Sequence, residues 1–280
     1  MELYKIETGY FKLDGGAMFG VVPKVLWQKL YPADENNQCN LAMRSLLIKD
    51  GEKLILIDTG LGDKQDEKFI HNFGLFGDDT MEKSFAKTPF TFDDVTDVIL
   101  THLHFDHCGG VLKYNDDKTQ FISVFKNAKI WCSQQQWDLA MKPNAREKSS
   151  FLKENIYPIL ETKQLQLFDK NFFLTPDVEL RLSHGHTLGL ILVYINYNNK
   201  KMVFTADLLP IVAHIPSAWV MSYDTYPLVT IDEKTALLNE ALEKNQTLFF
   251  QHDFYTECCT VIQTEKGIRM DKTLKFEEFL

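Results

Sequence analysis

The stretch THLHFDHCGG at residues 101–110 carries more information than any other part of the chain. It places three of the eight histidines and one aspartate within six positions, directly after the largely apolar run 95–100. Imidazole and carboxylate groups are ligands that suit zinc, and also iron or manganese. The two glycines that end the stretch let the backbone turn tightly beneath such a site. The stretch therefore predicts a metal site rather than a solvated loop.

The spacing of the four polar side chains favours two metal ions over one. His102 and His104 are two positions apart, so we expect them to project to the same side of an extended turn. Asp106 and His107 are adjacent and are expected to point elsewhere, where they can reach a second ion. Cys108 follows directly, but its neighbours already occupy the ligand directions. We therefore interpret Cys108 as a small buried residue.

This motif resembles His-x-His-x-Asp-His of the metallo-β-lactamase superfamily, and four more elements of that family accompany it in order. They are the strand end Asp58-Thr59-Gly60, the loop Gly185-His186-Thr187, the strand end at Asp207 and the segment around His252. The resemblance implies that His102, His104 and His186 bind one metal ion. It also implies that Asp106, His107 and His252 bind the second, that Asp207 bridges both, and that a hydroxide completes the bridge.

Strand-like and helical segments alternate along the chain, which predicts an α/β or α+β architecture. The resemblance narrows this to an α/β fold, a four-layer αββα sandwich. No repeat or linker interrupts the sequence, so we expect one hydrolase domain over residues 1–280. The predicted helices are 134–141, after Ser133, and 234–244, after a capping box of Thr230 and Glu233. The turn 198–200 predicts a hairpin, and the strand-like runs are 45–49, 53–57, 95–100, 128–132, 178–182, 190–197, 201–205 and 247–251.

Composition narrows the setting in which the protein works. The formal net charge of −9 disfavours non-specific binding to nucleic acid, which needs clustered Lys and Arg. No run of 18 apolar residues is present, so we expect no membrane span. Residues 1–7 lack the basic and apolar regions of a secretory signal. With five cysteines, an odd number that fits reduced thiols, we expect a cytoplasmic protein.

Several features narrow the activity within the family. The main subclass of zinc β-lactamases carries Cys where this chain has Asp207, and a bridging Asp resembles the lactonase, glyoxalase II and phosphotriesterase branches. The strand-like tail 256–269 has only two basic residues, which argues against a glutathione thioester. Runs 16–24 and 206–224 resemble the quorum-quenching lactonases. Long irregular segments such as 11–32 and 211–227 are often binding loops, and they supply five candidates for an apolar pocket wall, with core packing as the alternative: Phe19, Trp27, Trp219, Met221 and Tyr223.

We therefore expect a dimetal hydrolase that opens a lactone such as an N-acyl homoserine lactone, with Asp106 carrying a proton to the leaving group. The alternatives are an organophosphate, phosphodiester or thioester hydrolase on the same metals, and a non-catalytic, metal-stabilised ligand-binding protein. The ligands favour two zinc ions and leave iron, manganese and cobalt open. The substrate is expected to be a small apolar ester or lactone, and homodimerisation stays open. Open too are the roles of His184, His214 and Asp58, the last as partner of a ligand histidine or as a turn residue.

Overall fold

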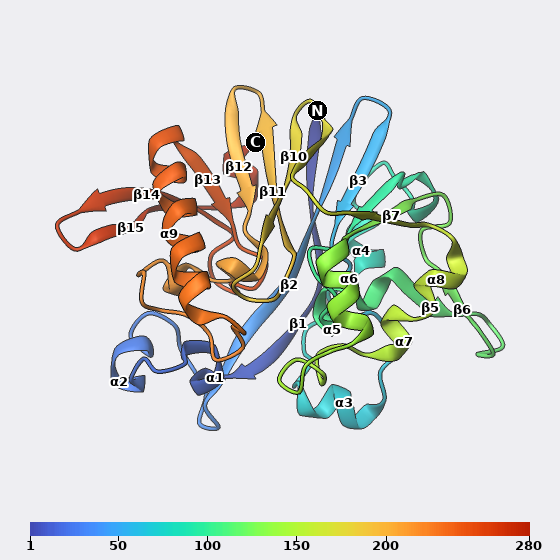
Figure 1. Ribbon diagram of the computed structural model, residues 1–280, viewed down its shortest axis with the longest axis horizontal. Coiled ribbons are helices and arrows are strands. Elements are labelled where there is room, and N and C mark those ends of the chain that lie inside the picture. The colour runs from blue at the N-terminus through green and yellow to red at the C-terminus, as the bar shows by residue number, and fades with distance from the viewer. The chain divides into compact units, whose positions relative to one another are not determined.

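The computed structural model describes residues 1–280, and the chain divides into two compact units. Unit 1 comprises Met1–Tyr10 and Met43–Asp169, and unit 2 comprises Phe11–Ala42 and Lys170–Leu280. Each unit is built from segments that lie far apart in the sequence, as the colours of Figure 1 show. Each combines strands and helices, as the alternation in the sequence predicts.

Most of a six-stranded sheet belongs to unit 1, with the strand order β1-β2-β3-β4-β7-β8. Strand β2 is antiparallel to β3, whereas β3, β4, β7 and β8 run parallel to one another. The β3 and β4 side chains are almost all buried, as expected where parallel strands are covered on both faces. The strands are β1 (Glu2–Asp14), β2 (Gln38–Asp50), β3 (Lys53–Ile57), β4 (Asp97–Ile99), β7 (Lys129–Ser133) and β8 (Leu165–Phe168).

Helix α6 (Gln134–Met141) packs against β7 and β8 and confirms the predicted helix 134–141. Its N-cap is Ser133, whose side chain accepts a hydrogen bond from the backbone N–H of Gln136. The remaining elements of unit 1 are short: α3 (Glu67–Asn72), α4 (Met81–Phe85), η1 (Phe92–Asp94), α5 (Phe105–Cys108), η2 (Gly109–Val111), β5 (Leu112–Tyr114), β6 (Phe121–Ser123), α7 (Lys153–Ile156) and α8 (Ile159–Thr162).

Unit 2 holds a seven-stranded sheet in the order β15-β14-β13-β12-β11-β10-β9, in which only β12 and β13 pair in parallel. The predicted hairpin at 198–200 is confirmed, because Asn198 and Asn199 have φ of 47° and 64°, as a tight turn of this kind requires. The strands are β9 (Phe172–Thr175), β10 (Val178–Ser183), β11 (Leu190–Tyr197), β12 (Lys200–Phe204), β13 (Gln246–Phe249), β14 (Cys258–Thr264) and β15 (Gly267–Leu274).

The long helix α9 (Pro227–Lys244) begins earlier than the sequence predicts. Its N-cap is Tyr226 and Pro227 is its first residue, where a proline loses no hydrogen bond. The predicted capping box is wrong: Thr230 lies inside the helix, and the Glu233 carboxylate binds another loop. Helix α9 lies along β13 and β14 (Figure 1), and its apolar residues Leu237, Leu238 and Ala241 are buried.

The N-terminal segment is more regular than expected. Residues 11–14 continue strand β1, and α1 (Gly15–Phe19) and α2 (Lys24–Trp27) follow. The other short helices of unit 2 are η3 (Ala206–Leu208), η4 (Val212–His214) and α10 (Phe276–Phe279). No helix has both the length and the apolar character needed to cross a membrane. All five cysteines are free and buried.

The buried stripe of α9 should carry a large share of the stability of unit 2. Replacing Leu238 by Ala removes buried methyl groups and leaves a cavity, so the free energy of unfolding should fall by about 2–5 kcal/mol. Leu228 on the same helix is 75% exposed and serves as the matched control. Chemical denaturation of both variants tests this, and equal stabilities of Leu238→Ala and Leu228→Ala would contradict the packing described.

Candidate metal centre

The predicted ligands of unit 1 lie on the turn after β4 and on the short helix α5. All four side chains are buried. The ring centroid of His102 lies 4.5 Å from that of His104 and 3.8 Å from that of His107. The Asp106 carboxylate oxygen Oδ2 lies 3.6 Å from Nε2 of His107. One strand-to-helix turn therefore gathers all four groups, and the ring of His102 lies closer to that of His107 than to that of His104.

Asp58 organises this cluster. Its Oδ1 accepts a hydrogen bond from the backbone N–H of Thr101 at 2.7 Å. Its Oδ2 accepts the Thr101 hydroxyl at 2.7 Å and lies 3.0 Å from Nδ1 of His107. The Thr101 hydroxyl oxygen lies 3.2 Å from Nδ1 of His102, and since its proton goes to Asp58, it must accept from that ring. Both imidazoles thus carry their proton on Nδ1, which makes Nε2 the nitrogen that can coordinate a metal.

The fold places Asp58 at this point by a backbone conformation that few residues adopt. Asp58 directly follows β3 with φ of 58°, in the left-handed region. The next residue, Thr59, donates both its N–H and its hydroxyl to the carbonyl of His107, at 2.8 and 3.0 Å. Of the two roles left open for Asp58, the observed contacts fit the partner of ligand histidines.

The glycine pair after the motif is needed because the loop after β3 passes directly beneath it. A Cβ on Gly109 would lie 1.9 Å from the carbonyl oxygen of Leu61, and one on Gly110 would lie 2.2 Å from that of Thr59. Lys64 on the same loop donates to the carbonyls of Gly109 and Leu112, the latter at 2.7 Å. The end of the metal-binding turn is therefore fixed by close backbone packing as well as by hydrogen bonds.

A second carboxylate near the motif, Glu147, was missed in the sequence. It is buried, and its Oε1 lies 3.7 Å from Nε2 of His104. The ring of Phe151 packs against His104 with centroids 5.1 Å apart. Asn144 orients the carboxylate by donating from Nδ2 to its Oε2. No motif marks Glu147, because it lies in an irregular segment far along the chain.

Unit 2 brings together the three remaining predicted ligands. His186 follows β10, Asp207 lies in η3 after β12, and His252 follows β13. The two oxygens of the Asp207 carboxylate face different rings: Oδ2 lies 3.3 Å from Nε2 of His186, and Oδ1 lies 3.0 Å from Nε2 of His252. One carboxylate thus lies between two imidazole nitrogens, an arrangement suited to bridging two cations.

The Nδ1 atoms of His186 and His252 also have hydrogen-bonding partners. Nδ1 of His252 donates to the carbonyl of Ala42 at 2.7 Å, and Nδ1 of His186 lies 2.9 Å from Oδ1 of Asp224. The other Asp224 oxygen accepts the N–H of Met221 at 3.0 Å. Asp224 is a site residue that the sequence did not reveal, since it lies on an irregular loop 38 positions after its partner.

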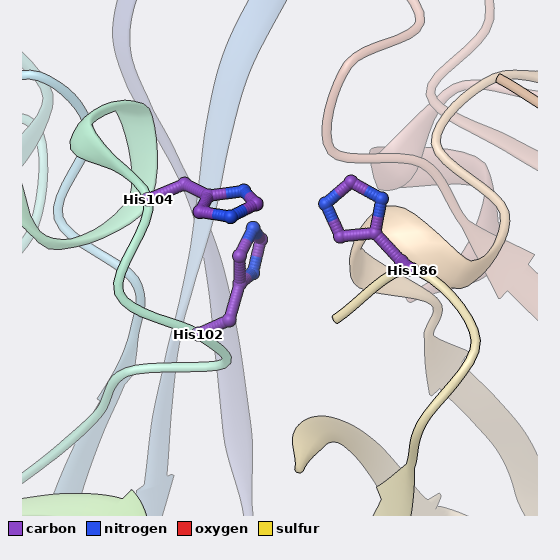
Figure 2. Close-up of side chains that lie close together, drawn as sticks. All are labelled: His102, His104 and His186. Atoms are coloured by element: carbon purple, nitrogen blue, oxygen red, sulfur yellow. The ribbon is translucent and has the colours of Figure 1, made fainter. Parts of the chain in front are cut away.

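Three groups of these side chains place their ligand atoms within 4.8 Å of one another, and Figure 2 shows the first of them. Their donor set fits metal ions, because the histidines are buried and those with a fixed Nδ1 proton present Nε2 as a lone-pair donor. Imidazole and carboxylate donors without a thiolate suit zinc and also iron, manganese or cobalt. The groups are His102, His104 and His186; His102, His107 and Asp207; and Asp106, His107 and His252.

The other histidines and Cys108 lie outside the three groups of possible metal ligands. Nδ1 of His184 accepts the N–H of Gly189 at 3.2 Å, so this ring shapes its own loop. His214 is buried with Nε2 2.9 Å from the carbonyl of Met18, and burial lowers its pKa to about 3. His71 is exposed on α3. The Cys108 side chain is buried and contacts the carbonyl of Leu103, in line with its predicted packing role.

The five candidates for an apolar pocket wall have different surroundings. Phe19 and Trp27 are core residues, because they are fully buried and their rings stack with centroids 4.7 Å apart. The rings of Trp219 and Phe19 meet edge to face with their centroids 6.1 Å apart, and Trp219 is only half-buried. Met221 is buried and Tyr223 is exposed. The aromatic residues before 30 are therefore part of the packing of unit 2, and only the later ones remain candidates for contact with a substrate.

The chain matches a known protein family and has curated relatives. Residues 44–252 match the family model described as the metallo-beta-lactamase superfamily, more than half of the chain. An N-acyl homoserine lactonase of Bacillus thuringiensis is 26% identical over 240 residues, which cover 78% of this chain and 84% of the relative. The match includes residues of both units.

Solved structures give the same picture. A probable metal-dependent hydrolase from Staphylococcus aureus is 32% identical, with a TM-score of 0.88, and the likeness covers 99% of this chain and 97% of that one. AidC, a dizinc quorum-quenching lactonase solved with a product, is 24% identical with a TM-score of 0.76, covering 98% and 95% of the two chains. These likenesses confirm the predicted α/β fold.

The hydrogen-bond network of Asp58 generates a specific prediction. Asp58→Asn replaces one acceptor oxygen by an N–H₂ group facing donors, so His102 and His107 lose their fixed orientation. Zinc affinity should fall about 10- to 100-fold, as when such an outer partner is removed. The measurement is metal content after dialysis against graded chelator.

The matched control is Asp97→Asn. Asp97 is equally buried in unit 1, but its carboxylate binds Lys53 and Trp131 rather than a histidine. It should lose stability and keep its zinc affinity. Equal zinc affinities in the Asp58 variant and the wild type would show that Asp58 is only a turn residue.

Proposed function

Because the chain belongs to the metallo-β-lactamase superfamily, we propose that it is a dimetal hydrolase that opens lactones, with N-acyl homoserine lactones as the leading class. The observation that carries the proposal is the grouping of imidazole and carboxylate ligand atoms within 4.8 Å of one another. The family match takes in both compact units, which supports a single hydrolase domain across residues 1–280.

In this proposal the ligands divide between two ions as the sequence motif implies. Asp207 would be shared by the two ions, a role that its two oxygens support by facing His186 and His252 separately. When bound, two divalent ions lower the pKa of a shared water and polarise the oxygen of the substrate carbonyl. His102, His104 and His186 would hold one ion, and Asp106, His107 and His252 would hold the other.

The protein's own groups orient the ligands and move the proton. Asp58 and Asp224 hold the Nδ1 protons of the ligand rings, which keeps Nε2 in its coordinating form throughout the reaction. Asp106 has two carboxylate oxygens, one to bind metal and one to carry a proton to the departing alkoxide. His214 does not serve as the acid, because with a pKa of about 3 its ring is neutral near pH 7.

The choice of a lactone rests on the relatives and on residue 207. The Bacillus thuringiensis relative is named as an N-acyl homoserine lactonase. Asp207 stands where the main zinc β-lactamases carry a cysteine, so penicillin hydrolysis is not the proposed activity. Trp219 and Tyr223, which are not fully buried, offer apolar surface for an acyl chain. Reduced, buried cysteines agree with the proposal that the enzyme works in the cytoplasm.

The substrate class can be tested by acid release from a panel of N-acyl homoserine lactones. Zinc-loaded protein should release acid rapidly, and both chelation and Asp207→Ala should abolish the release, because each removes the bridged metal pair. A phosphotriester and an acyl thioester are run in parallel. Faster turnover of either would replace the lactone by that substrate, and tight lactone binding without turnover would favour a ligand-binding protein.

Asp106 can be tested separately as the proton carrier. Asp106→Asn keeps one oxygen for the metal and loses the group that takes up a proton, so kcat should fall about 10²- to 10⁴-fold. Metal content is measured on the same samples, so that a lost ion is told apart from lost proton transfer. A variant with both ions and a near-wild-type kcat would refute this role for Asp106.

A further inference from the structure

Two adjacent residues of α9 carry opposite charges and bind the backbones of two different loops. Glu233 accepts hydrogen bonds from the loop that leads into His186, and Lys234 donates to the loop that leads into Asp224. Neither residue forms a salt bridge, whereas Glu240 of the same helix pairs with Arg181. The two side chains therefore act on main-chain groups.

The Glu233 carboxylate collects donors from three consecutive residues. Its Oε2 accepts the Ser183 hydroxyl at 2.5 Å and the N–H of Gly185 at 3.0 Å. The N–H of His184 reaches both oxygens, at 2.8 and 3.0 Å. Gly185 also lies against the helix so closely that a Cβ would be 2.4 Å from the backbone of Thr230. The chain just before His186 is thereby fixed to α9.

Lys234 has the complementary set of contacts. Its side chain is buried, and Nζ donates to the carbonyls of His214, Pro216 and Trp219 at 2.9, 3.2 and 2.5 Å. An ammonium has three N–H donors, which match these three acceptors. Burial lowers the pKa of Lys234 to about 8 while the nearby Asp224 raises it, so the group is mainly protonated at neutral pH. The loop 214–219 is thereby fixed to the same helix turn.

Both loops converge on His186. The loop held by Lys234 continues into Met221 and Asp224, and the Asp224 carboxylate holds Nδ1 of His186 at 2.9 Å. Two backbone bonds join the loops directly, from Thr225 to the carbonyl of His186 and from Tyr226 to that of Gly185, both at 2.9 Å. The first turns of α9 thus hold the backbone next to His186 through Glu233, and they hold the imidazole ring of His186 through Lys234 and Asp224.

We propose that Glu233 and Lys234 are positioning residues that together set the orientation of His186 toward its metal ion. Burying charged groups costs free energy, and apolar replacements of such groups are often as stable, so stability alone does not account for the pair. A role in orienting a metal ligand does account for the pair, because an imidazole must direct its Nε2 accurately toward a metal ion to coordinate it. The inference rests on the proposed function only in taking His186 as a metal ligand.

The experiment measures zinc binding and does not depend on any substrate. Glu233→Gln and Lys234→Met are compared with Glu240→Gln and Lys244→Met, which alter a charge pair at the far end of the same helix. Each protein is titrated with Zn²⁺ against a competing chelator, and the visible spectrum of the Co²⁺ form reports the ligand geometry. The melting temperature of each metal-free protein is recorded as well.

Both test variants should bind one of the two ions about 10- to 100-fold more weakly, with a changed Co²⁺ spectrum. The control variants should bind both ions as the wild type does. Unchanged affinity and spectrum in Glu233→Gln and Lys234→Met would overturn the inference. If Glu233→Gln fails to fold, Ser183→Ala removes a single donor to the carboxylate, and it should weaken the same ion; unchanged binding there overturns the inference as well.

The outcomes separate this inference from the proposed function. A wild type that binds two ions but opens no lactone would refute the proposed substrate class. The role of Glu233 and Lys234 would still stand if their variants lose one ion. A wild type that binds no ion at all would overturn both. Equal losses in the test and control variants would reduce the pair to a general contribution to stability and overturn the inference.

Discussion

The hydrogen bonds on the outer nitrogens of the histidines determine what this site can do. An imidazole can coordinate through either nitrogen, and a metal centre needs that choice made before the ion arrives. Asp58 makes it for His107 directly and for His102 through Thr101, while Asp224 and the Ala42 carbonyl hold His186 and His252. The ligand geometry therefore depends on groups that do not themselves touch a metal.

Each of these outer groups comes from a strand end or loop that the fold places beside a ligand. Asp58 directly follows β3, in the left-handed conformation, and lies next to the turn after β4 because parallel neighbours finish at the same edge of a sheet. In unit 2 the first turns of α9 hold the loops before His186 and Asp224. Strands and helices thus position the loops, and residues in the loops supply the groups that hold the ligand histidines.

The sequence predicted those features that are local in the chain. Helix α6 and strands β3 and β11 follow from short-range pattern and capping, and the α/β fold follows from the motif resemblance. It did not predict partners that meet only in three dimensions, such as Asp224 with His186. The start of α9 was misplaced because Thr230 and Glu233 match a capping box, whereas tertiary contacts use Glu233 elsewhere. Nor could the pattern tell the stacked core rings Phe19 and Trp27 from pocket walls.

One carboxylate serving two histidines has a thermodynamic consequence. Asp58 holds His102 and His107, which the proposed assignment gives to different ions. In that assignment, an ion that binds one ring would further restrain Asp58 and Thr101, and so lower the remaining entropy cost of holding the other ring. With the proposed ligands, the two binding events would therefore be linked, and by reciprocity each ion would strengthen the binding of the other by the same factor. A centre of this kind would fill as a unit, so that half-loaded protein would be scarce when metal is limiting.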